Sequence, residues 1–185
     1  MNVKMKRLGT SEKEIERLRS LGFKYDKCTV RQMIAANNKT TGASLDSIKK
    51  LEFDIGSSLP DDYKNFLISY DGGLPEPAAF DIPGENNSSI VKEFFGLDTP
   101  LLTASIEYNR RMYENRIPKK FLVIGCDVFG NRIILGIKND NYGEIFFWDH
   151  ENEADEDNVE EYYENIYLIS KNFSDFLNSL RNSEK

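Results

Sequence analysis

The feature that constrains the fold most is a series of short apolar runs in the second half of the chain. Four such runs are predicted strands, and they span residues 121–126, 132–138, 144–149 and 163–169. The first two connections are short and contain Gly, Asn and Asp, which is typical of turns. Parallel neighbours would need crossovers of about a dozen residues or more, so these strands are predicted to form an antiparallel meander.

The rest of the chain shows mainly helical spacing. Ser11 and Glu14 have the spacing of a capping box at the start of a short helix. Pro60 suits the first position of another helix, because its ring fixes φ and it has no N–H to leave unpaired. Apolar residues three and four positions apart predict helices over residues 11–22, 44–56, 60–70, 101–115 and 172–180.

Two further strands are predicted over residues 78–82 and 90–97. The order of helices, then strands with one interrupting helix, then a closing helix is typical of α+β proteins. We therefore predict an α+β fold: an antiparallel sheet of about five to six strands packed with N-terminal and C-terminal helices, plus an extra N-terminal helix.

The segment from residue 24 to residue 43 is polar and is predicted to be a loop or linker. It separates the first helix from the remaining elements. We therefore predict two parts, an N-terminal extension of one helix and a loop over residues 1–43, and an α+β domain over residues 44–182.

The formal charge of −7 is concentrated in one place. Residues 149–164, here called the acidic segment, contain nine carboxylates and no Lys or Arg, and removing nine negative charges from −7 leaves +2. Because the rest of the chain is close to neutral, it offers few unpaired Lys and Arg residues for a basic surface stripe that binds phosphates. Direct nucleic-acid binding is therefore not expected.

The hydropathy pattern and the cysteines indicate the cellular compartment in which the protein is expected. No stretch approaches the roughly 20 apolar residues of a membrane helix, and the charged first residues do not resemble a secretory signal. The two cysteines, Cys28 and Cys126, are too far apart for a CxxC or metal-binding spacing. They are predicted to be small core residues in a reducing compartment, so we expect a cytoplasmic protein that binds no membrane.

Three possible chemical motifs are incomplete. The acidic segment matches the ligand positions of an EF-hand loop, but Ala154 replaces the glycine that the calcium-binding turn requires. Gly125 and Gly130 have the spacing of a phosphate loop, but the lysine that should follow is missing. His150 is the only histidine, and no G-x-S-x-G nucleophile motif accompanies it. We therefore predict no metal site, no cofactor and no catalytic residue.

Several motifs occur together in the order of a known family, which is more specific than any one of them alone. Over residues 44–180 the chain resembles the SUKH superfamily, named partly for the yeast Smi and Knr regulators. The motifs that carry the resemblance are Leu59-Pro60-Asp61-Asp62-Tyr63, Asp71-Gly72-Gly73, Ile117-Pro118, Gly130-Asn131, Tyr142-Gly143-Glu144, Phe147-Trp148-Asp149 and Asn172-Phe173-Ser174-Asp175-Phe176-Leu177.

The resemblance implies an α+β fold, no enzymatic activity and, for bacterial members, a role as immunity protein against polymorphic toxins, often nucleases. Two features depart from the family pattern: Asp71 stands where Asn is common, and residues 1–43 have no counterpart. We therefore predict an immunity protein that binds and neutralises a cognate toxin, possibly a basic nuclease, and that is itself a monomer or weak homodimer. The alternative is an intracellular regulatory or scaffold module without a toxin partner.

The acidic segment is the predicted partner-binding site. Its charge would steer a basic partner, and aromatic residues at its ends would serve as anchors after docking. The competing interpretation is a solvated loop between two strands. The predicted contact residues are Trp148, Asp149, Glu151, Glu153, Asp155, Glu156, Asp157, Glu160, Glu161 and Tyr162.

Overall fold

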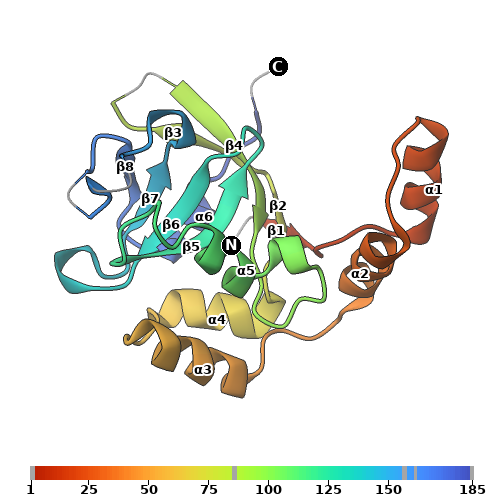
Figure 1. Ribbon diagram of the computed structural model, residues 1–185, viewed down its shortest axis with the longest axis horizontal. Coiled ribbons are helices and arrows are strands. Elements are labelled where there is room, and N and C mark those ends of the chain that lie inside the picture. The colour runs from red at the N-terminus through yellow and green to blue at the C-terminus, as the bar shows by residue number, and fades with distance from the viewer. Residues whose placement is uncertain (1–2, 85–86, 156–157, 161, 184–185) are drawn as a thin grey trace.

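The computed structural model describes residues 3–84, 87–155, 158–160 and 162–183. It confirms the α+β prediction: a six-stranded antiparallel sheet has the order β3-β4-β5-β6-β7-β8, and β1 pairs with β2 in a separate small sheet (Figure 1). The strands are β1 (Lys4–Lys6), β2 (Leu74–Glu76), β3 (Ala79–Ile82), β4 (Asn87–Phe94), β5 (Phe121–Asp127), β6 (Arg132–Gly136), β7 (Ile145–Trp148) and β8 (Ile166–Ser170).

The helices begin at the capping residues that the sequence indicates. Ser11 and Ser44 accept hydrogen bonds from the backbone N–H groups three residues on, and Asn172 does the same for Asp175 at 2.7 Å. The α-helices are α1 (Glu12–Ser20), α2 (Lys27–Asn38), α3 (Leu45–Ile55), α4 (Asp61–Tyr70), α5 (Ile106–Met112) and α6 (Phe173–Ser179).

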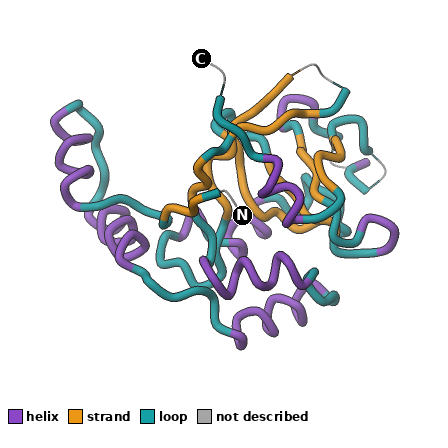
Figure 2. The backbone as a smooth tube through the Cα atoms, turned by 180° about the vertical axis from the view of Figure 1, so that it is seen from behind, coloured by secondary structure: helices purple, strands orange, loops and turns teal. Residues whose placement is uncertain are grey.

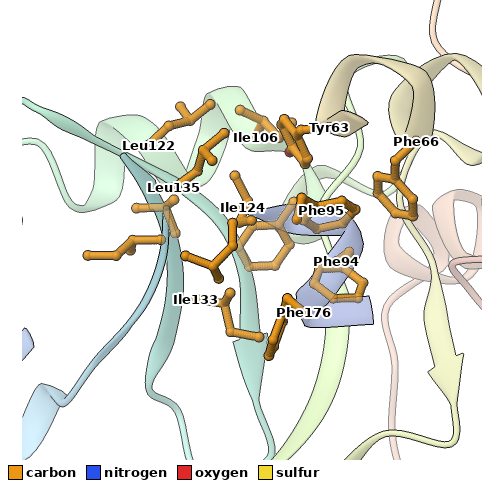
Figure 3. Packing of buried hydrophobic residues seen from close by; sticks show 14 of the residues in the cluster. Tyr63, Phe66, Phe94, Phe95, Ile106, Leu122, Ile124, Ile133, Leu135 and Phe176 are labelled. Atoms are coloured by element: carbon orange, nitrogen blue, oxygen red, sulfur yellow. The ribbon is translucent and has the colours of Figure 1, made fainter. Parts of the chain in front are cut away.

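The core lies between the sheet and the helices α4 and α6. Phe94 of β4 meets Phe66 of α4 (Figure 3), with ring centroids 5.6 Å apart. The ring centroid of Phe173 in α6 lies 4.8 Å from that of Phe66. Tyr63 and Phe176 complete this aromatic cluster, and all five side chains are at most 5% exposed. Aromatic burial on this scale fixes both helices against the sheet.

The N-terminal extension contributes Leu8 and Ala36 to the hydrophobic core, while most of it projects outward. Helices α1 and α2 project from the body on the far side of the β1–β2 pair, whereas α3 and α4 lie together beneath the sheet (Figures 1 and 2). We call α1 and α2 together the arm. Its attachment to the body includes β1, in which Met5 pairs with Pro75 of β2.

The prediction of a loop over residues 24–43 is wrong, because most of that segment is the helix α2. Asp26 caps it by accepting from the backbone N–H groups of Cys28 and Thr29 at 2.8 and 3.0 Å. Only Ala36 in this helix is buried, so the helix has too few apolar contacts to produce a strong periodic pattern. The boundary between residues 43 and 44 stays a prediction.

The helix predicted over residues 101–115 is interrupted and shorter. A single 3-10 turn, η1 (Leu102–Ala104), precedes α5, and Ser105 between them is extended. The backbone of Gly96 accepts from Ile106 N–H and donates to the carbonyl of Ala104. Because this bridge needs an extended Ser105, one continuous helix cannot form there.

Candidate functional site

The acidic segment links β7 to β8 and is fixed to the body at both ends. Asp149 accepts from the backbone N–H of Glu151 at 2.9 Å and from the side-chain amide of Asn152 at 2.7 Å, which caps the short 3-10 helix η3 (His150–Asn152). Buried Asn165 holds the other end: its side-chain amide donates to the Asp149 carbonyl at 2.9 Å. The first residue of the segment is thus hydrogen-bonded to the residue that follows its last one.

A guanidinium group holds the middle of the segment. Arg116 forms an ion pair with Glu153, with 2.9 Å between Nε and Oε2, and this hydrogen bonding raises the pKa of Arg116. The guanidinium carbon also lies 4.6 Å from the ring centroid of Tyr113 and 5.6 Å from that of Trp148. Glu153 is therefore engaged within the protein rather than free for a partner.

A second contact comes from the same part of the chain. The backbone N–H of Lys119 donates to Glu160 at 3.2 Å, and Lys120 Nζ lies 4.3 Å from the ring centroid of Tyr163. The hydroxyl of Tyr163 donates to the Glu160 carbonyl at 2.8 Å. These contacts hold the acidic segment against residues 116–120.

The remaining carboxylates form the outward surface of the segment. Four are exposed, and of these Glu151, Asp155 and Glu164 form no ion pair with any described residue. Tyr162 is half-buried. Three predicted contact residues lie outside the described part of the chain, namely Glu156, Asp157 and Glu161. The exposed carboxylates, here called the acidic face, are Glu151, Asp155, Glu160 and Glu164.

The prediction of Trp148 as a contact residue is wrong. Its side chain is 1% exposed and packs edge-on against Tyr113, with ring centroids 5.6 Å apart. β7 is an interior strand between β6 and β8, and all four of its residues are buried. An aromatic residue next to an acidic loop is here a core residue, because both faces of its strand are covered.

Besides Tyr163 within the segment, an exposed aromatic residue lies in the nearby β5–β6 turn, which sequence reasoning passed over. Phe129 is 69% exposed and Val128 is 49% exposed. The sequence does contain a signal for this exposure, because residues in the middle of a tight turn usually face solvent. Two neighbouring exposed apolar residues beside the acidic segment make this turn a candidate contact point.

A hydrogen-bond network joins this turn to the acidic segment. Buried Asp127 accepts from Ser89 Oγ at 2.7 Å and from the side-chain amide of Asn131 at 2.8 Å. The amide oxygen of Asn131 lies 2.7 Å from His150 Nδ1 and accepts from the His150 backbone N–H at 3.1 Å. The turn and the start of the acidic segment are therefore held as one unit beside a cavity of about 380 Å³.

Two groups in this region are poorly suited to nucleophilic chemistry. Burial raises the pKa of Cys126 to about 11, so its thiol is protonated at neutral pH and is a weak nucleophile. The Ser89 hydroxyl donates to Asp127, which already accepts from two backbone N–H groups, those of Phe129 and Asn131. A carboxylate with its acceptor sites filled is a structural centre for the turn rather than a base.

Several of the described carboxylates of the acidic segment also form hydrogen bonds or an ion pair within the protein, and these interactions would compete with cation binding. Asp149 caps a helical turn, Glu153 pairs with Arg116 and Glu160 accepts a backbone hydrogen bond. Within the described ranges, no three His, Cys, Asp or Glu side chains are grouped so that they could hold a metal ion. In the same part of the chain, no helix has the length and apolar character needed to cross a membrane.

Comparison with known proteins identifies the family. The pattern that defines the SMI1 / KNR4 family (SUKH-1) matches residues 42–179 of this chain. The chain belongs to the SMI1 / KNR4 family. A relative of this SMI1 / KNR4 protein is the SPbeta prophage-derived uncharacterized protein YokK of Bacillus subtilis (strain 168), which is 31% identical over 155 residues that cover 73% of each chain.

One departure from the SMI1 / KNR4 pattern has a structural explanation. Asp71, where the family commonly has Asn, is buried and accepts from the backbone N–H of Leu97 at 2.6 Å and of Asp98 at 3.1 Å. Its carboxylate also pairs with Lys39 Nζ at 2.9 Å. Lys39 is the residue that ends α2, so the carboxylate ties the arm to the matched domain.

Proposed function

We propose that this chain is an immunity protein that binds a cognate protein toxin, with a basic nuclease as the expected class, and neutralises it by direct contact without catalysing a reaction. Family membership supports this proposal, as does the relation to a prophage-derived protein. The observation that carries the binding mode is the acidic face, because its carboxylates point outward from a segment that the body holds in place.

A fixed acidic face suits recognition of a basic protein. Negative potential accelerates the encounter with a positively charged partner. The partner would then cover the acidic face together with the Phe129 turn that the Asp127 network fixes beside it.

The experiment is co-expression with a toxin gene that lies next to the gene for this chain. We expect the chain to restore growth and to co-purify with the toxin as a complex. A toxin that stays lethal and is not captured would overturn the proposal. Capture of a non-toxic partner by the same face would instead support a regulatory or scaffold module.

Neutralising the acidic face is expected to slow association. The change is Glu151→Gln, Asp155→Asn and Glu164→Gln together, three exposed carboxylates without an ion pair among the described residues. The association rate constant should fall roughly three- to tenfold at low salt and depend less on salt, because steering is a screened long-range effect. Stopped-flow or surface-based kinetics at several salt concentrations measures this.

A matched control removes the same number of charges elsewhere. Glu12→Gln, Glu16→Gln and Asp46→Asn alter exposed carboxylates on α1 and in the first turn of α3. Their association rate should stay close to that of the unaltered chain. Equal slowing by both triple variants would show that net charge, and not this face, steers the partner.

A further inference from the structure

A groove of about 460 Å³ borders the Phe129 turn and is not part of the acidic segment. Strands β4 and β5 supply Glu93 and Cys126 to its lining, and α5 supplies Met112. The rim is apolar and open to solvent, since Met112 is 52% exposed and Phe129 is 69% exposed. A concave site with an apolar rim and a polar interior is typical of a pocket that receives an anchoring side chain.

Glu93 is a partly buried carboxylate in the lining of this groove, and Lys92 and Cys126 both contact its Oε1 at long distances. Its side chain is 15% exposed, and Lys92 Nζ lies 3.9 Å from Oε1. The Cys126 thiol lies 4.0 Å from the same oxygen. The Lys92 distance exceeds the usual range of about 2.7–3.2 Å for an N–H···O hydrogen bond, the thiol is a weak donor, and a partly buried carboxylate with only weak partners is unfavourable. Burial accordingly raises the pKa of Glu93, although Lys92 and Arg132 oppose this shift.

Arg132, the other cation that lines the groove, uses its two terminal nitrogens for other residues, and its Nε is buried without a hydrogen-bond partner among the described residues. Its Nη1 donates to the Gly130 carbonyl at 2.7 Å and to the Asn131 carbonyl at 3.2 Å. The guanidinium carbon lies 4.4 Å from the ring centroid of Tyr113, and Nη2 also donates to the hydroxyl of that residue. Glu93 thus has room for a donor that comes from outside the chain.

We propose that this groove receives an arginine side chain of the partner protein, with the guanidinium on Glu93 and the apolar stem between Met112 and Phe129. This inference rests on the proposed function, because the partner is the toxin. Charge complementarity supports it, since the Asn131–His150 contact places the acidic segment beside the same turn. Arginine fits better than lysine, because its planar donors pair with a carboxylate bidentately and stack on aromatic rings.

Glu93→Gln is expected to stabilise the free protein while weakening binding. A carboxyl whose pKa is raised on folding contributes stability below its unfolded pKa, and this contribution is lost as pH rises through the folded pKa. The glutamine side chain carries no charge, so the variant should have the higher Tm at neutral pH and lose that advantage below about pH 4, near the unfolded pKa of Glu. The groups facing Glu93 are Lys92, Cys126, Asp127 and Arg132. Thermal unfolding at several pH values measures the difference.

The site itself is tested without the toxin. In NMR titrations we expect Nα-acetylarginine amide to shift the Glu93 carboxyl carbon and the Phe129 ring protons, with saturation in the millimolar range. Nα-acetylcitrulline amide has the same shape without the charge and should bind at least tenfold more weakly. Glu93→Gln should abolish saturation, and Glu12→Gln should leave it unchanged. Equal shifts from both probes, or no saturable shift, would overturn the inference.

The toxin then separates this inference from the proposed function. If the unaltered chain captures the toxin, Glu93→Gln and Phe129→Ala should each increase the dissociation constant at least tenfold. Capture that both substitutions leave unchanged would overturn the groove and leave the immunity function standing. Failure of the unaltered chain to protect, together with saturable binding of the arginine probe, would overturn the function and leave the groove.

Discussion

Replacing Lys39 with methionine is expected to lower the free energy of unfolding by about 3–5 kcal/mol, because it leaves a buried carboxylate without its counter-charge. The Asp71 side chain is 1% exposed, and Lys39 Nζ is the cation that pairs with it at 2.9 Å. For a chain of this length the loss corresponds to a fall in Tm on the order of 6–20 °C. Thermal and denaturant unfolding followed by circular dichroism measures it.

Two further variants show whether the ion pair is the cause. Lys24→Met removes an exposed lysine from the same extension and should change the stability by less than about 0.5 kcal/mol. Asp71→Asn in the Lys39→Met background removes the unpaired charge and should restore most of the loss, since the backbone donors of Leu97 and Asp98 can still bond to the amide oxygen. A double variant as unstable as Lys39→Met would contradict this explanation.

Trp148→Ala is expected to destabilise the fold by about 3–5 kcal/mol and to leave the partner affinity of the folded protein unchanged. The side chain is 1% exposed and fills the space beside Tyr113 and under the Arg116 guanidinium. Removing it creates a cavity in the sheet layer rather than a gap in a binding surface. Denaturant unfolding gives the first quantity, and calorimetric titration at low temperature gives the second.

Trp148→Phe is the control for this experiment. A phenyl ring keeps most of the apolar volume, so the loss of stability should be well below that of the alanine variant. Trp148 is also the only tryptophan, so its fluorescence reports directly on burial in the unaltered chain. If toxin binding makes the Trp148 fluorescence less accessible to a quencher, the indole would lie in the interface, contrary to the structure.

Much of the fold could be predicted because local chemistry determines it. Ser44 and Asn172 satisfy the first N–H groups of their helices, and such capping is visible in the sequence. The short connections of the meander likewise leave few arrangements other than antiparallel pairing. α2 was missed because a helix that buries only Ala36 need not carry a regular apolar stripe.

The candidate site was harder to predict because distant contacts determine it. Arg116 and Glu153 are 37 positions apart, so their ion pair leaves no local pattern. Trp148 was wrongly predicted to contact a partner because its burial depends on which strands flank β7. The residues near Trp148 in the sequence do not reveal those neighbouring strands. Glu93 passed unnoticed for the same reason: its lack of strong donors follows from packing against β5 and α5, not from its neighbours in the chain.

The projecting arm makes the distribution of charge in the molecule uneven. Residues 1–43 contain ten Lys and Arg but four Asp and Glu, a net of +6, which leaves −13 for the rest of the chain given the total of −7. Net positive charge in the N-terminal extension, and net negative charge in the rest of the chain that is concentrated in the acidic segment, separate the two signs of charge within the molecule. We expect it to rotate in the field of a charged macromolecule before any surfaces touch, so that fewer collisions arrive in the wrong orientation.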